Sequence, residues 1–273
     1  MYTFGRFETV RKTAVLLNRY RNPPLFGAAD QSRDIHALPV NDVAAQIERD
    51  GLFSGLVLKQ ETLEQLQKYC AETVCYGEGE RSLPLYAQDR EAAEERYRRR
   101  ILLGRYLDCR SECPPVARLE HDATLRAIAR RYFGSEPVLI GARMWWSFAT
   151  HSTPDEQSKS GQTFHYDIDG YRSLAFFFYL TDVDEEGGPH IYVSGSHKRK
   201  QLRHLVSLKK SRMDAQIEST YGRSAVKTLE GKAGHGFAED IFCFHKGLGP
   251  RKRDRLVLQI RFGLHDYGTS VAG

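Results

Sequence analysis

The chain has 273 residues, of which 41% are hydrophobic and 27% charged, enough for one sizeable core with decorations. It has no run of about eighteen apolar residues, so we expect no membrane-spanning helix, and its first residues lack the features of a signal peptide. The net charge of +5 is too small to indicate nucleic-acid binding by itself.

The five cysteines favour a reducing environment. Their number is odd and none forms a CxxC pair, so a disulfide framework is not expected. Cys109 and Cys113 could share a helix face, but no nearby residue completes a zinc set. We therefore predict a cytoplasmic protein with ordinary thiols.

The first half of the chain, residues 1–135, is predicted to be an arm and a helical region packed on a core. Residues 1–40 look irregular because prolines interrupt them, and Asn41 and Asp42 are candidate caps for the next helix. Residues 51–58 predict a turn into a short strand. Helical patterns are expected at 60–75, 89–100 and 116–133. The charge-dense helix at 89–100 is interpreted as a solvated face, in preference to a basic patch for a phosphorylated partner.

The second half, residues 136–273, predicts a β-rich core. Short β-like runs separated by turn residues are typical of a jelly roll or barrel. A helical insertion is expected near 203–230, and the polar loop at 150–162 is either a lid over a site or a surface excursion. The expected strands are 138–148, 163–168, 173–180, 191–193, 241–244 and 255–262.

His165, Asp167 and His245 form the most informative pattern in the chain. Residues two apart in a strand point to the same side, so His165 and Asp167 can face into a barrel together. With His245 from a distant strand they would make a two-His-one-carboxylate set, which leaves half of an octahedral metal open and suits non-haem Fe(II). His245 alone would be interpreted as a core histidine.

Arg255 follows His245 by ten residues and offers a guanidinium group to a carboxylate. Arg251 and Arg253 share its parity, but they lie in a charge-rich, loop-like stretch, whereas residues 256–260 are a clear strand. We therefore prefer Arg255 at the start of that strand. The other two are expected to be solvated, or to form a rim that attracts an anion.

Several stretches resemble the phytanoyl-CoA dioxygenase family over roughly residues 136–265. The resemblance lies in the His165–Asp167 pair, in the strand from Phe177 into an Asp-rich turn, in a Gly-Ser-His element and in the run from Asp240 to Arg255. Two turn positions depart from the family pattern: Gly187 stands where Asn is usual and Ser194 where Pro is usual. Asp167 is present where halogenating relatives have a small residue, which favours hydroxylation.

This resemblance implies a mainly β fold with helices, a double-stranded β-helix of the jelly-roll or cupin kind. It also implies Fe(II) held by His165, Asp167 and His245, 2-oxoglutarate as co-substrate paired with Arg255, and O2. Oxidative decarboxylation would release succinate and CO2 and hydroxylate an unactivated C–H bond. Phe177 and Tyr179 share a strand face that would lie near the co-substrate; plain core packing is the alternative.

The residues expected to contact substrate are less sharply defined. Arg143 and Trp145 share one parity of their strand, and we prefer that set over Met144 and Trp146 because Arg143 could meet a carboxylate or phosphate. His190 and Tyr192 follow a Gly-Pro turn and are expected near the barrel mouth. His197 is interpreted as tying down its turn rather than binding metal.

We therefore predict an Fe(II)/2-oxoglutarate-dependent dioxygenase acting on a small or medium organic substrate, and the mild positive charge favours an anionic one. Desaturation, cyclisation or demethylation on the same iron site remains open, as does a non-catalytic jelly-roll binding module. A nucleic-acid demethylase is disfavoured because the basic residues of 198–212 have no interleaved aromatic residues. The pattern does not address the oligomeric state.

Overall fold

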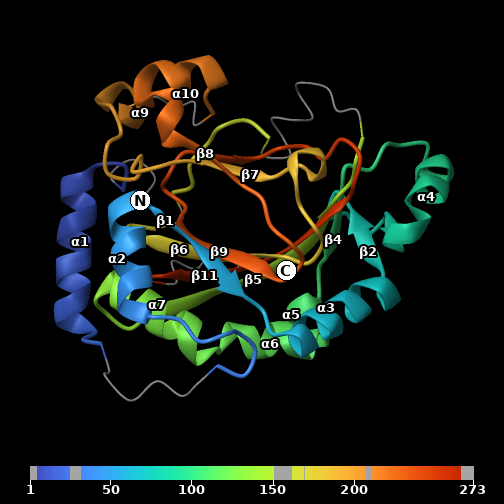
Figure 1. Cartoon of the computed structure of the whole chain (residues 1–273), viewed down its shortest axis with the longest axis horizontal. Coiled ribbons are helices and arrows are strands. Elements are labelled where there is room, and N and C mark those ends of the chain that lie inside the picture. The colour runs from blue at the N-terminus through green and yellow to red at the C-terminus, as the bar shows by residue number, and fades with distance from the viewer. Residues whose placement is uncertain (1–4, 25–31, 151–161, 169, 207–210, 266–273) are drawn as a thin grey trace.

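The computed structural model describes residues 5–24, 32–150, 162–168, 170–206 and 211–265. Two antiparallel sheets form its centre (Figure 1). The larger sheet contains β1 (Leu52–Val57), β2 (Cys75–Gly77), β3 (Pro84–Leu85), β4 (Leu103–Tyr106), β5 (Val138–Ser147), β6 (Ser173–Tyr179), β9 (His235–Asp240) and β11 (Arg255–Gly263). The smaller one contains β7 (His190–Val193), β8 (Val226–Leu229) and β10 (His245–Gly247).

The order of the strands places distant segments side by side. Among the described residues the larger sheet has the order β1-β9-β6-β11-β5-β4-β2-β3, and the smaller sheet has the order β10-β7-β8. Every strand therefore has an antiparallel partner, and the two sheets lie as facing layers (Figure 1). The predicted double-stranded β-helix fold with added helices is confirmed.

The alternation along β6 explains why the larger sheet has two different faces. Leu174, Phe176 and Phe178 belong to the cluster on the helix-covered face, whereas Phe177 and Tyr179 belong to the cluster between the sheets. Successive side chains of a strand point to opposite faces, and both faces here are covered, so the whole strand is buried. The apolar run in the sequence arises from this double coverage.

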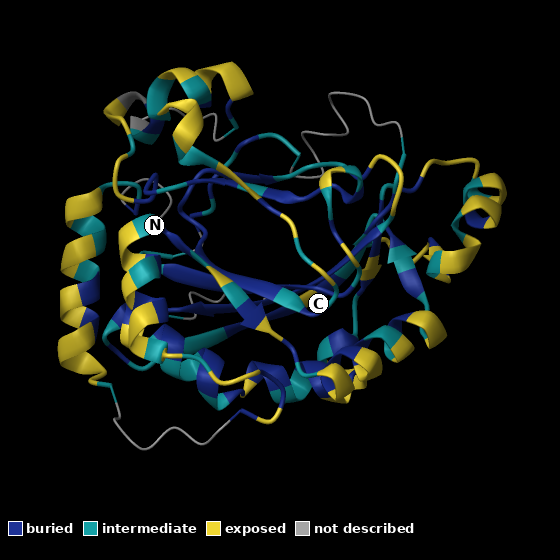
Figure 2. Cartoon of the chain, in the orientation of Figure 1, coloured by how far each residue is buried: buried dark blue, intermediate teal, exposed yellow. Residues whose placement is uncertain are grey.

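Helices cover the outer face of the larger sheet, with their exposed residues turned outward (Figures 1 and 2). Buried residues of α7, such as Leu125, Ile128 and Phe133, share one core cluster with β6 and β11. The α-helices are α1 (Glu8–Arg21), α2 (Val40–Asp50), α3 (Gln60–Glu72), α4 (Arg90–Tyr97), α5 (Cys109–Glu112), α6 (Pro114–Glu120), α7 (Ala123–Phe133), α9 (Leu202–Val206) and α10 (Asp214–Tyr221), and the 3-10 turns are η1 (Ala87–Asp89), η2 (Glu185–Gly187) and η3 (Arg223–Ala225).

The helices of the N-terminal half differ from their prediction in three ways, and strands β2, β3 and β4 were not predicted. Residues 8–21 form α1 and are not irregular. The helix expected at 116–133 is two helices, because the Asp122 side chain accepts the backbone N–H groups of Thr124 and Leu125 and starts α7 there. The helix expected to be capped by Asn41 or Asp42 begins at Val40, with no side-chain cap.

Strands from the first 135 residues also enter the larger sheet. Strand β1 pairs with β9, and β4 pairs with β5, so this half contributes strands to the core sheet as well as its helical layer. The predicted division at residue 135 stays a prediction.

In the second half, two expected strands are not strands. Phe164 pairs with Arg212 and His165 with His245, so consecutive residues of 163–168 bond to different segments and no ladder forms. Residues 241–244 are a turn, because the Asp240 side chain accepts the N–H of Phe242 and its carbonyl accepts that of Cys243. Strands β8 and β9 were not predicted, and the expected insertion at 203–230 contains α9, α10, η3 and β8.

The two departures in the turns differ in their local consequences. At Gly187 a Cβ would come no closer than 3.5 Å to a neighbouring atom, so this position does not require glycine, whereas the next residue, Gly188, has φ +73° and a Cβ there would meet the Leu248 carbonyl oxygen at 2.5 Å. Ser194 donates its N–H to the Ala225 carbonyl at 2.8 Å, a bond that proline could not make. None of the described helices has the length and hydropathy that a membrane crossing requires.

Candidate metal centre

A cavity of about 490 Å³ lies between the two sheets. Its described walls come from β4, β5, β6, β9 and β11 of the larger sheet and β7 and β10 of the smaller one. Aromatic side chains such as Trp145, Phe177 and Phe237 line it together with charged groups. A concave, partly apolar site with a few convergent polar groups is the usual form of a small-molecule site.

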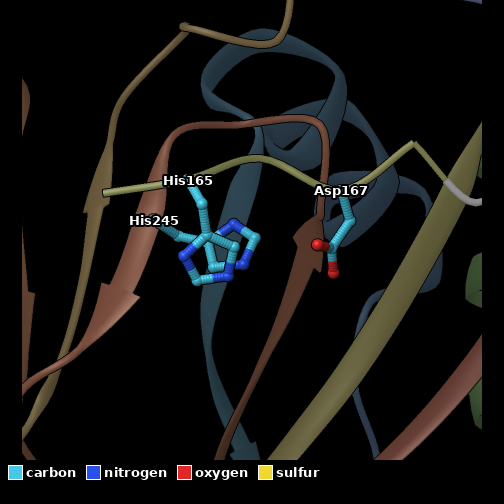
Figure 3. A group of neighbouring side chains, drawn as sticks. All are labelled: His165, Asp167 and His245. Carbon is cyan, nitrogen blue, oxygen red and sulfur yellow. The ribbon is translucent and has the colours of Figure 1, made fainter. Parts of the chain in front are cut away.

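His165, Asp167 and His245 meet at this cavity. One ligand atom from each lies within 4.8 Å of the others, which is close enough to share one metal ion. His165 and Asp167 extend from one segment and His245 from β10, and all three side chains point into the same space (Figure 3). The backbones of His165 and His245 bond to each other in both directions, at 2.9 and 2.8 Å, which fixes the spacing of the two imidazoles.

The two imidazoles are oriented for metal binding through Nε2. His165 Nδ1 lies 2.8 Å from the Thr163 carbonyl oxygen, and His245 Nδ1 lies 3.0 Å from that of Cys243. An Nδ1–H donated to a carbonyl leaves Nε2 with its lone pair, which is the usual arrangement of a ligating histidine. The donor set therefore fits a divalent metal such as Fe(II).

His245 is buried beside two further polar groups. The Glu239 carboxyl lies 3.5 Å from His245 Nδ1 through Oε1 and 2.8 Å from His190 Nε2 through Oε2. Burial lowers the pKa of His245 to about 4 and that of His190 to about 3, and it raises the pKa of Glu239 to about 8. These directions indicate a neutral acid bonded to a neutral imidazole rather than an ion pair, and a neutral His245 is the form that binds metal.

Asp167, the carboxylate of the triad, lies near arginine side chains. Arg261 Nη2 is 4.0 Å from Asp167 Oδ2. Burial lowers the pKa of Arg261 and of Arg143, and the charge of Asp167 opposes that effect in both. The Asp167 carboxylate and these guanidinium groups therefore attract one another.

Arg255 begins β11 and is buried, as 7% of its surface is exposed. Its guanidinium group donates to the Leu248 carbonyl at 3.2 Å and to Ser147 Oγ at 3.3 Å. Its Nε is buried without a hydrogen-bond partner, and no described carboxylate pairs with it. A buried cation in this state favours an anionic ligand in the cavity. The rivals Arg251 and Arg253 lie at the surface and pair with acids at positions 184–186.

Of the other predicted site residues, most reach the cavity. Phe177, Tyr179, Arg143, Trp145 and His190 line it. Tyr192 does not: it is buried in the apolar cluster between the sheets, opposite His245 in the β7–β10 pairing, and is absent from the described lining. Strand parity alone could not show how deep in the barrel this side chain ends.

Sequence reasoning missed several residues of the site. Gln259 and Arg261 share the parity of Arg255 on β11, so the alternation of that strand could have identified them. Arg105, Phe237 and Glu239 lie on β4 and β9, and no sequence signal pointed to them. His197 lies 3.2 Å from the Glu48 carbonyl oxygen and 3.5 Å from Cys243 Sγ, holding the turn together. The possible lid at 150–162 lies almost wholly outside the described residues.

Comparison with known proteins agrees with this geometry. The family model described as phytanoyl-CoA dioxygenase (PhyH) matches residues 47–250, which include all three triad residues and end before Arg255. No curated protein matches the chain.

Several solved structures share the fold. The chain is 17% identical to HygX from Streptomyces hygroscopicus with nickel and 2-oxoglutarate bound, covering 83% of this chain and 87% of that one, with a TM-score of 0.55. It is 16% identical to EctD from S. alaskensis with 2-oxoglutarate and 5-hydroxyectoine (89% and 82% covered, TM-score 0.54). It is 15% identical to the epimerase SnoN in complex with Fe3+, alpha ketoglutarate and nogalamycin RO (82% of each, TM-score 0.54).

Proposed function

Because this chain belongs to the phytanoyl-CoA dioxygenase family, a family of Fe/2-oxoglutarate-dependent oxygenases, we propose that it hydroxylates an unactivated C–H bond of a small or medium organic molecule. One observation carries the proposal. Three ligand atoms of two imidazoles and a carboxylate converge within 4.8 Å, in a cavity that also holds a buried arginine with no carboxylate partner among the described residues.

In this proposal His165, Asp167 and His245 hold Fe(II). The backbone bonds at Nδ1 keep each imidazole in one tautomer and aim its Nε2 at the metal. Arg261 lies 4.0 Å from the Asp167 carboxylate and would help to orient it. With only three protein ligands, the metal would keep positions for the co-substrate and oxygen.

Arg255 is proposed to bind the far carboxylate of 2-oxoglutarate. The guanidinium group is held at the start of β11 by Ser147 and the Leu248 carbonyl, which leaves donors for a charge-assisted bond. Phe177 and Tyr179 form the adjoining wall. Tyr179 is fixed there because its hydroxyl donates to the Leu229 carbonyl and accepts the His190 N–H.

The bound iron and 2-oxoglutarate would supply the oxidising power, with O2 consumed and succinate and CO2 released as the C–H bond becomes C–OH. The chain would bind the substrate beside the triad, keep the C–H bond near the open metal face and exclude water with Trp145, Phe237 and Val257. Small organic molecules in two of the related structures support a substrate of this size.

Hydroxylation is proposed over other outcomes because the Asp167 carboxylate is present as the third ligand, in contrast to halogenating relatives. The related proteins include an epimerase and a carbocyclase. The mass of the product therefore has to identify which reaction this protein catalyses. Mass spectrometry after a substrate screen would show a gain of one oxygen for hydroxylation, a loss of two hydrogens for desaturation or cyclisation, and no change for epimerisation.

The test of the oxygenase itself precedes any screen. Iron-loaded protein is incubated with 2-oxoglutarate, and succinate is measured beside calorimetric binding of Mn(II) and 2-oxoglutarate, for the wild type and for His165→Ala and Arg255→Ala. We expect slow succinate formation that His165→Ala abolishes. A wild-type protein that binds neither metal nor 2-oxoglutarate would overturn the proposal and favour a jelly-roll binding module.

We also infer a reducing, cytoplasmic location. All five cysteines are buried free thiols, which is typical of proteins from a compartment where thiols stay reduced.

A further inference from the structure

Three arginines lie on neighbouring strands along one wall of the cavity. This arginine row consists of Arg105 on β4, Arg143 on β5 and Arg261 on β11. Arg143 pairs with Gln259 of β11, and Arg105 pairs with Trp145, two residues along from Arg143. Long side chains reach each other at such diagonal positions, and the three groups therefore form one positive surface.

The described cavity lining carries more positive than negative charge. Four arginines face only two carboxylates, those of Glu78 and Asp167. The Glu78 carboxylate accepts the backbone N–H groups of Leu102 and Leu103. A divalent metal and a dicarboxylate co-substrate would cancel each other's charge, so the excess of guanidinium groups would persist in the loaded enzyme.

Arg105 and Arg143 are available to a ligand. Both are exposed although they line the cavity, and neither forms a hydrogen bond or ion pair with any residue that the structure describes. Burial lowers the pKa of Arg105, Arg143 and Arg261, and the charge of Arg143 lowers the pKa of Arg105 and of Arg261 further. Like charges gathered on one surface destabilise a protein, so an anion that joins them would be bound favourably.

The arginine row is distinct from the proposed co-substrate site. Arg255 lies four residues before Gln259 on β11, or about 13 Å along the strand. Besides burial, the charge of Arg255 lowers the pKa of His190, which lies near His245. The charge of Asp167 instead acts on Arg143 and Arg261, where it raises the pKa against the effect of burial. Arg255 and the arginine row therefore have different neighbours and different places in the strand register.

We propose that Arg105 and Arg143 bind an oxyanion group, a carboxylate or a phosphate, of the primary substrate, and that this contact sets which C–H bond reaches the metal. The proposal rests on the proposed function, which assigns Arg255 to the co-substrate. Trp145 extends from the same face of β5 as Arg143 and lines the cavity, so it would contact the apolar part of the substrate.

The test uses anionic probes and needs no turnover. Protein with Mn(II) and saturating 2-oxoglutarate is titrated with phenyl phosphate, benzoate and neutral benzyl alcohol, and tryptophan fluorescence is followed, because one of the two tryptophans lines the cavity. We expect an anionic probe to bind at least about tenfold more tightly than benzyl alcohol, and Arg143→Gln or Arg105→Gln to weaken it by about 10–100-fold. Preference for phenyl phosphate indicates a phosphate ester, and preference for benzoate a carboxylic acid.

Matched variants separate this site from the rest of the protein. Arg143→Lys keeps the charge and should retain most of the affinity, and the exposed Arg223→Gln, paired with Glu218 away from the cavity, should change nothing. Equal binding of anionic and neutral probes, or unchanged binding in both glutamine variants, would overturn the proposal. So would a loss of 2-oxoglutarate affinity in Arg143→Gln as large as that of the probe.

Failure of the proposed function would look different. In that case the wild type would bind no 2-oxoglutarate at all, and the probe titration repeated without it would still show whether Arg105 and Arg143 hold an anion.

Discussion

The two ends of the cavity differ in burial and in bonding. At the deep end, defined by His190, Glu239, His245 and Arg255, every side chain is buried and each has at least one described polar contact. At the open end, defined by Arg105 and Arg143, the side chains are exposed and form no bond to described residues. The deep end is built to hold one fixed arrangement, whereas the open end leaves its charges for a ligand.

The largest expected effect comes from a ligand at the deep end. We expect His245→Ala to lower succinate formation by more than about 100-fold, because loss of an outer-sphere partner alone costs about 10–100-fold. Succinate is measured beside Mn(II) affinity, with the buried His197→Ala as control because its contacts are structural. Wild-type metal affinity in His245→Ala would contradict the proposed ligand set.

The next largest effect is expected from Arg255, the buried cation at the deep end of the cavity. Arg255→Gln removes the charge that would pair with 2-oxoglutarate, so we expect the half-saturating 2-oxoglutarate concentration to rise by about 10–100-fold. The exposed Arg251→Gln, whose partners are Glu185 and Glu186, is the matched control. If Arg251→Gln had the larger effect, the choice among the three arginines would be wrong.

A smaller effect concerns the stability of the deep end in acid. The folded-state pKa of His190 is about 3, below the unfolded value near 6.5, because burial disfavours the charged ring. Between these values the unfolded chain binds more protons, so stability is full above about pH 6.5 and falls as the pH decreases.

Chemical denaturation of metal-free protein at pH 7 and pH 4.5 measures this loss. We expect the wild type to lose about 1–2 kcal/mol more than His190→Gln, which cannot take up a proton. An equal loss in both proteins would show that His190 does not titrate between its folded and unfolded values.

The smallest expected effect concerns stability at the open end of the cavity, where a substitution should stabilise the protein rather than destabilise it. Arg143→Gln removes one member of a group of like charges, so the free energy of unfolding should rise by up to about 0.5 kcal/mol. Thermal unfolding of metal-free Arg143→Gln and Arg255→Gln gives the comparison. A clear destabilisation by Arg143→Gln would assign this arginine a role in the fold.

The sequence predicted the parts of the site whose signal is local. The His165–Asp167 spacing and the parity of Arg143 and Trp145 follow from the two-residue period of a strand, and the choice of Arg255 over Arg251 and Arg253 follows from its place at the start of a strand. The structure brings His165, Asp167, Arg143, Trp145 and Arg255 to one cavity. The same period covers Gln259 and Arg261, which were overlooked although the pattern contained them.

Local patterns failed where the backbone bonds are not local. Residues 163–168 carry strand-like side chains, yet their backbone groups bond to separate segments: the Phe164 carbonyl accepts the Arg212 N–H, whereas His165 donates its N–H to the His245 carbonyl. Strand β9 was overlooked, and with it Glu239, because its Gly, Ala and acidic residues lack a β pattern. The burial of Tyr192 also depends on how the smaller sheet packs against the larger one, which the sequence of β7 alone does not show.

The sequence by itself therefore determined the residue types of the candidate site, their order and the family to which the chain belongs, since these depend on residue identity and spacing. Only the tertiary structure decided which charges share a cavity. The pairing of β4 with β5 and of β5 with β11 brings Arg105, Arg143 and Arg261 together from positions far apart in the chain. The electrostatic field at the site depends on distances in space, and these are set by strand register and burial.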